Sequence, residues 1–175
     1  ANVKVLVGDN GFKSFFKDLV DWAEENKKEY LFISGGKGFI DQFGLDYHDK
    51  IQNEKRKRGI KCKGILNEMS RPLLEHNICG DIKYLSNNYT IPTSTWMYND
   101  KVVIVLWQVK PIITIIISSK YSFESYKSYF AYLWDLPTKF NDQTTYSTKL
   151  LKMTEKTKTF DILLNGVLQT TLVSS

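Results

Sequence analysis

The sequence predicts an α/β domain in which helices flank a mixed sheet. Apolar segments short enough to be strands alternate with segments whose apolar residues recur every three or four positions, which is the helical period. Two strongly apolar runs are separated only by Asn99-Asp100, which indicates a tight hairpin. The chain has 175 residues, 42% of them hydrophobic and 14% aromatic, so we expect one ordinary core.

The first expected elements are a strand, a helix and a second strand. The apolar run from Val3 to Val7 stops at the turn-forming letters GDNG, and "YLFISGGKG", from Tyr30 on, is typical of a buried strand that enters a glycine-rich loop. Between them lies a helical stripe made of Phe12, Phe15, Phe16, Leu19, Val20 and Ala23. We expect a β-α-β unit with a right-handed crossover and a parallel sheet at this point.

The later elements follow from the same patterns. Residues 39 to 58 are expected to form a second helix that ends in the basic letters EKRKRG, where Gly59 suits a left-handed stop. Next come the alternating strand "IKCKGIL", a loop or short helix from Asn67 to His76, and the short strand "DIKYLS". The hairpin, the strand "IITIIIS" and the helix "SFESYKSYFAYLWDL", which Pro137 ends, complete this part of the chain.

The composition changes after this helix. Residues 138 to 160 are polar and rich in threonine, whereas "FDILLNGVLQTTLV" predicts two strands around a turn at Asn165-Gly166. We therefore divide the chain into a domain of residues 1–137 and a C-terminal extension of residues 138–175. The extension is expected to be a β-hairpin or the start of a second module.

Charge and cysteine content narrow the function classes. The net charge of +5 is compatible with an anionic ligand, but the excess is mostly lysine and does not by itself indicate nucleic-acid binding. Cys62 and Cys79 belong to no CxxC or Cys/His cluster, so we expect reduced thiols and no metal site. No signal peptide is evident and no apolar run approaches the ~20 residues of a membrane span. We expect a cytoplasmic protein without a cofactor and without membrane contact.

Three local features could support binding or catalysis. In "SGGKG", the glycines Gly35 and Gly36 would let backbone amides approach a phosphate and Lys37 would add charge, although an ordinary strand-to-helix turn explains the same letters. The basic run "EKRKRGIK" at 54 to 61 could attract a phosphate or could be a solvated helix end. A diverged phosphodiesterase or nuclease that combines this run with His48 is the alternative enzymatic hypothesis.

The order of these elements resembles a known family. The pieces that carry the resemblance are "YLFISGG", the helix ending "KRGIKCKGILNE", "IKYLS", "PTSTWMYNDKVVIVLW", "IITIII" and "SYKSYFAYLW". Together they are similar to the phospholipase D-like domain of the TrmB-type archaeal transcriptional regulators, over about residues 3 to 136. The resemblance implies a phospholipase D-like mixed sheet.

Catalytic members of the phospholipase D superfamily carry a HxKxxxxD motif in this hairpin. When Asp100 is matched to the aspartate of that motif, Thr93 takes the place of the histidine nucleophile and Thr95 that of the phosphate-binding lysine. Threonine offers neither a nucleophilic nitrogen nor a fixed positive charge. On this basis the chain is expected not to be an enzyme.

The resemblance also implies partners. Because superfamily members build one site from two half-units, a homodimer is expected, and the domain would act as an effector-binding or dimerisation part of a transcriptional regulator. A small-molecule effector would bind near Gly35, Gly36, Lys37, Thr93, Thr95 and Asp100. Such regulators contact DNA through a winged helix, which this chain is not expected to contain. A structural module that binds a partner through the tail hairpin is the remaining alternative.

Overall fold

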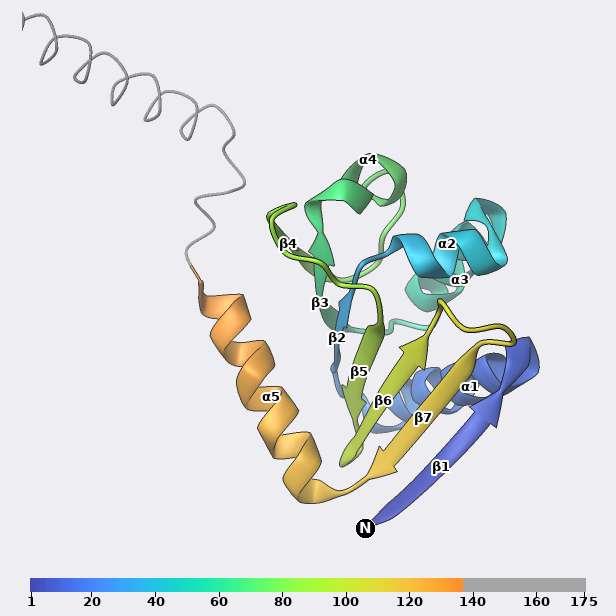
Figure 1. Ribbon diagram of the computed structural model, residues 1–175, viewed down its shortest axis with the longest axis vertical. Coiled ribbons are helices and arrows are strands. Elements are labelled where there is room, and N and C mark those ends of the chain that lie inside the picture. Colours follow the sequence, from blue (N-terminus) through green and yellow to red (C-terminus); the bar gives the residue numbers. More distant parts are fainter. Residues whose placement is uncertain (137–175) are drawn as a thin grey trace, which may run out of the picture. The chain divides into compact units, whose positions relative to one another are not determined.

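A seven-stranded mixed sheet forms the centre of the described part of the chain (Figure 1). The structure, a computed structural model, describes residues 1–136. The strands lie in the order β1-β7-β6-β5-β2-β3-β4. Their bounds are β1 Asn2–Val7, β2 Tyr30–Ser34, β3 Cys62–Asn67, β4 Asp81–Leu85, β5 Ser94–Tyr98, β6 Lys101–Leu106 and β7 Ile113–Ser118. The helices are α1 Gly8–Asn26, α2 Lys37–Phe43, α3 Leu45–Lys57, the 3-10 turn η1 Glu68–Ser70, α4 Arg71–Leu74 and α5 Lys120–Asp135. The predicted α/β class is confirmed.

The sheet is parallel on one side and antiparallel on the other. Strands β2, β3 and β4 are parallel, whereas β5, β6, β7 and β1 pair with their neighbours antiparallel. Strands β1 and β2 run in the same direction, as expected, but they do not pair with each other, so the sheet is not parallel at this point. Three strands lie between β1 and β2, and β1 pairs with β7 at the edge. A local pattern cannot reveal this, because the partner of β1 comes last in sequence among the strands that the structure describes.

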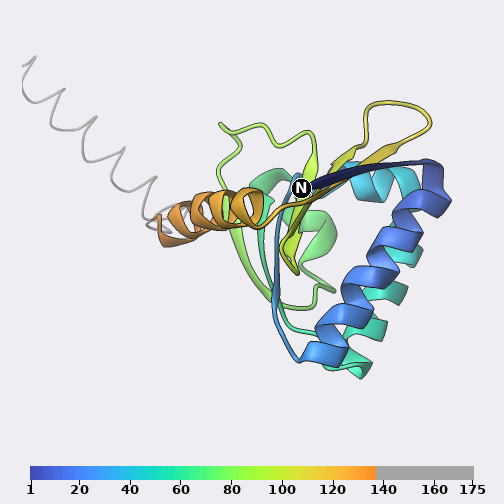
Figure 2. The ribbon, with the colours of Figure 1, turned by 90° about the horizontal axis from the view of Figure 1, so that it is seen from below.

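Helices cover the two faces of the sheet unequally. Helices α1, α2 and α3 lie on one face, and α5 alone lies on the other (Figure 2). The predicted stripe of α1 is buried, with Phe12, Phe15 and Leu19 at 2% exposure or less. On the other face, Phe130 of α5 packs with Ile65 and Met97. This stacking of a helix stripe on β-branched and aromatic strand residues is what burial of apolar surface favours.

Two predicted boundaries differ in the structure. Helix α1 begins directly at Gly8, so the letters GDNG form its first turn and do not make a separate loop. The helix predicted over residues 39 to 58 is two helices, because Gly44 adopts φ 85° and ψ 164°, a region that is essentially restricted to glycine. Gly59, with φ 65°, ends this region as predicted. Helix α5 is capped by Ser119, whose hydroxyl accepts from the backbone N–H of Ser122 at 3.3 Å.

Among residues 1–136, no helix is long and apolar enough to cross a membrane. The predicted hairpin at residues 160–173, and with it the proposed C-terminal extension, lies outside the described residues.

Candidate functional site

The loop after β2 is held by close backbone packing. A Cβ at Gly35 would lie 2.2 Å from the carbonyl oxygen of Ile91, and one at Gly36 would lie 2.8 Å from Ser70 and Leu74 side-chain atoms. Gly36 also has φ 80°, which L side chains rarely adopt. Both glycines are thus required by the packing of the protein itself. Their presence needs no ligand to explain it.

A chain of hydroxyl hydrogen bonds fixes the strand ends beside this loop. The hydroxyls of Ser34 and Ser94 lie 2.6 Å apart, and both residues are buried. Trp107 donates its indole N–H to Ser94 at 2.8 Å, and the N–H of Gly36 donates to Ser34 at 3.0 Å. Sequence reasoning missed both serines, because they become partners only through the pairing of β2 with β5.

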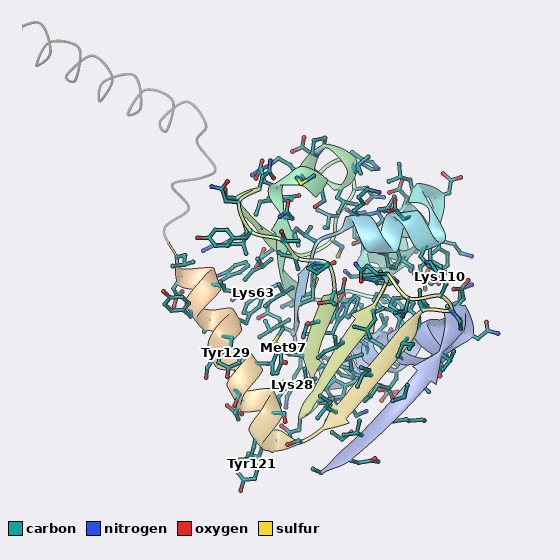
Figure 3. The ribbon with its side chains drawn as sticks, in the orientation of Figure 1. Lys28, Lys63, Met97, Lys110, Tyr121 and Tyr129 are labelled. Atoms are coloured by element: carbon teal, nitrogen blue, oxygen red, sulfur yellow. The ribbon has the colours of Figure 1, made fainter. Side chains whose placement is uncertain are left out.

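A cavity lies in front of this loop. A cleft of about 720 Å³ is lined by Gly35 and Lys37 on one side and by Asn67, Tyr89 and Lys110 on others. Figure 3 labels Lys110 at the loop beside α2. The volume is within the range of small-molecule sites, roughly 300–1,000 Å³. Lys37 forms an exposed ion pair with Asp41 at 2.5 Å, so its charge is partly neutralised.

The structure divides the predicted site residues between two ends of the sheet. Thr93 precedes β5 at the end where Gly35 lies, since Ser34 is the register partner of Ser94. Thr95 lies opposite Ile33 and Ile104, on the face that α5 covers in part. Asp100, with φ 53°, lies in the turn beyond the other end of β5, about 17 Å of strand away. Asp100 is therefore not brought together with the two threonines or the glycine loop.

The basic run at 54 to 61 does not form one charged surface. Lys55 is buried, with 3% exposure. Arg58 is engaged by Asp21 at 2.8 Å and by Glu24. Lys57, Arg56 and Lys61 remain on the outside. A contiguous platform for a phosphate backbone is thus absent from this segment.

His48 is enclosed. Its residue exposure is 6%, its ring meets that of Phe39 edge-on with centroids 6.0 Å apart, and its Nδ1 lies 3.3 Å from Asp49 Oδ1. Burial lowers the pKa of His48, and the nearby Asp49 carboxylate opposes that effect. A phosphodiester cannot contact this ring in the conformation described.

A second candidate surface lies on the face of the sheet that α5 covers only in part. Val3, Val5 and Val7 of β1 are 62%, 56% and 60% exposed. They continue across the sheet through partly buried register partners on β7 and β6: Ile113, Ile115, Ile117, Ile104 and Leu106. We call these eight residues the apolar sheet face, which ends at Val102, a residue with 0% exposure. Every residue in it is aliphatic.

Groups of three or more His, Cys, Asp or Glu side chains arranged to hold a metal ion do not occur within residues 1–136. Cys62 and Cys79 are both free thiols there.

Comparison with known proteins supports the fold and leaves the family open. No family model and no curated protein matches the sequence. Among solved structures, the chain is similar to TrmBL2, described as an archaeal chromatin protein whose structure shows a novel mode of DNA binding. That match has a TM-score of 0.53 at 17% identity and covers 77% of this chain and 50% of TrmBL2. The chain therefore spans about half the length of TrmBL2.

NucT from Helicobacter pylori is a further match, with a TM-score of 0.47 and 12% identity over 77% of this chain and 96% of NucT. The domain has a phospholipase D-like fold related to that of TrmB-type proteins. The expectation that the chain is not an enzyme is contradicted and is not kept. It depended on matching Asp100 to the aspartate of the motif, and Asp100 lies at the other end of β5 from Thr93.

Proposed function

We propose that residues 1–136 serve as the dimerisation and effector-binding module of a TrmB-like protein that regulates transcription, with DNA contacted through a winged helix. The observation that carries the proposal is the apolar sheet face. Its outline of three strands by six residues measures roughly 14 by 20 Å, or about 300 Å², with the corner at Val102 buried. Apolar patches of this size on monomers are often functional.

A second copy of this chain is the partner that suits the apolar sheet face. A surface without charges is complementary to itself across a two-fold axis, and it would form the apolar centre of an interface whose polar rim lies around it. The likeness to TrmBL2 supports the TrmB-like part of the proposal through the fold. In the same proposal, the cleft beside Gly35 and Lys37 receives the small-molecule effector.

The test replaces Val3, Val5 and Val7 together with threonine. Threonine keeps the branched shape and the strand preference of valine but adds a hydroxyl. Complete burial of a valine is worth about 1.5–3 kcal/mol, so the exposed 56–62% of each side chain is worth about 1 kcal/mol. A two-fold dimer contains each site twice. Each substitution should therefore weaken the dimer by about 2 kcal/mol, or about 30-fold in Kd.

Sedimentation equilibrium of the full chain measures this dissociation constant. Lys4→Thr is the matched control, because Lys4 lies on the same strand but on its opposite face. We expect a dimer for the wild type and for the control, and a monomer for the triple variant at the same concentration. A wild type that is monomeric at 100-fold the concentration used for the variants would refute the proposal.

A phosphodiester assay with wild type and His48→Ala tests the enzymatic alternative: turnover lost in the variant would assign catalysis to this chain.

A further inference from the structure

The side chain of Lys55 is a cation in the core. It extends from the last turns of α3 and is 3% exposed. Its Nζ lies 3.4 Å from Gln52 Oε1, 3.5 Å from Cys62 Sγ and 3.4 Å from the carbonyl oxygen of Cys79. Hydrogen bonds from an ammonium to oxygen are usually about 2.7–2.9 Å long. The two contacts to oxygen are thus longer than an ammonium normally makes, and the ring of Tyr30, with its centroid 5.4 Å from Nζ, is a further uncharged neighbour.

The neighbours of Lys55 supply no negative charge. None of the ion pairs within residues 1–136 involves Lys55. Burial raises the pKa of the Cys62 thiol and raises that of the Tyr30 hydroxyl well above its usual range, so both groups are neutral at pH 7. The pKa of His48 is lowered by burial, so that ring is neutral as well. A buried ammonium without a counter-ion is costly.

A small cavity adjoins this cation. Its volume is about 60 Å³, and its polar lining comes from Lys55, Gln52, His48, Tyr30 and Ser34, among aromatic and aliphatic side chains. An apolar cavity of about 150 Å³ holds a benzene ring, whereas one water needs about 10–15 Å³. The cavity can therefore hold a molecule of three or four heavy atoms, and it excludes an aromatic acid.

We propose that this cavity binds a small monovalent anion, such as a one- or two-carbon carboxylate or nitrate, with Lys55 as its counter-ion. The amide of Gln52 is the second donor, because its Oε1 already accepts from Lys55 and from the N–H of Cys79 at 2.9 Å, which orients its NH₂ group. When the anion is bound, it is the counter-ion that Lys55 lacks, and the two form a buried ion pair. This site is independent of the dimer, since α3 lies on the face of the sheet opposite α5.

The test uses urea unfolding of the full chain in increasing sodium formate, with sodium benzoate as an anion of equal charge that is too large. A ligand of the folded state raises the unfolding midpoint in a saturable way. We expect formate to do so in the wild type and in Lys28→Met, which removes an exposed lysine, and benzoate to have no such effect. In Lys55→Met the apparent Kd for formate should rise at least about tenfold, because a hydrogen bond to a charged group is lost.

Equal formate effects in the wild type and in Lys55→Met would overturn the proposal, as would saturation by benzoate. Should Lys55→Met fail to fold, amide NMR of the wild type decides. Formate should shift the signals of Gln52 and Tyr30 saturably, and shifts confined to exposed lysines would show ordinary surface association and refute the site. The triple valine variant should retain formate binding, so failure of the dimer and failure of the anion site are distinguishable.

Discussion

Replacing Gly35 with alanine tests why the loop after β2 contains adjacent glycines. The added Cβ would lie 2.2 Å from the carbonyl oxygen of Ile91, against an ordinary contact of at least 3.4 Å. Gly35 is not among the glycines with positive φ, so the substitution adds a steric overlap without backbone strain. The loop or the segment containing Ile91 must therefore shift by about 1 Å. Overpacking of this kind costs about 1–3 kcal/mol.

Gly59→Ala is the matched control, because it separates backbone strain from overlap. Gly59 has φ 65° and nothing within 4 Å of an added Cβ, so its cost of about 1–2 kcal/mol comes from conformation alone. Gly36→Ala combines φ 80° with contacts at 2.8 Å and should be the most destabilising of the three. Urea unfolding gives the free energies of unfolding.

Amide chemical shifts locate the effect of each substitution. Gly35→Ala should move the signals of Asn87, Tyr89, Thr90 and Ile91, which line the cleft, whereas Gly59→Ala should leave them in place. If Gly35→Ala were as stable as the wild type, with those signals unmoved, the packing explanation would fail. Close approach of a ligand to the backbone would then be the better reason for this glycine.

Two further predictions concern buried polar groups. Thr114 Oγ1 is buried on β7 without a hydrogen-bond partner among residues 1–136. Urea titrations should therefore show that Thr114→Val raises the free energy of unfolding by about 1–2 kcal/mol, whereas Thr114→Ser lowers it. A valine variant less stable than the wild type would mean that the hydroxyl is hydrogen-bonded. Because burial lowers the pKa of His48, the unfolded chain binds the proton more tightly, so stability is full above about pH 6.5 and falls as the pH drops. His48→Gln should flatten unfolding midpoints measured between pH 7 and 5, and an unchanged slope would contradict this.

Periodicity in the sequence predicted most elements but not how they pair. The stripe of α1 and the hairpin of β5 and β6 are local patterns, and both are present. Strand β1 carries no local sign that its partner is β7. Gly44 breaks the predicted helix because its backbone conformation is nearly inaccessible to other residues, and the letters FGLD around it do not disclose that conformation.

Two of the residues expected to bind a ligand, Gly35 and Lys37, line one cleft, whereas Asp100 is far from it. Ligand binding by these residues stays a prediction. Lys55 resembled one more member of a basic run. Its spacing of three from Gln52, and of seven from His48, places the three on one helical face, which is the signal that could have identified them as buried.

The position of β1 has a consequence for biosynthesis. The strand is made first, but β7, its partner in the sheet, is completed only when Ser118 has been added. At ordinary translation rates the aliphatic residues of β1 wait on the order of ten seconds without a partner strand. The pairing of β1 with β7 also joins the two described strands that are farthest apart in sequence, and contacts of this kind slow folding. The nascent chain is therefore most prone to aggregation, or most in need of a chaperone, until β7 pairs with β1.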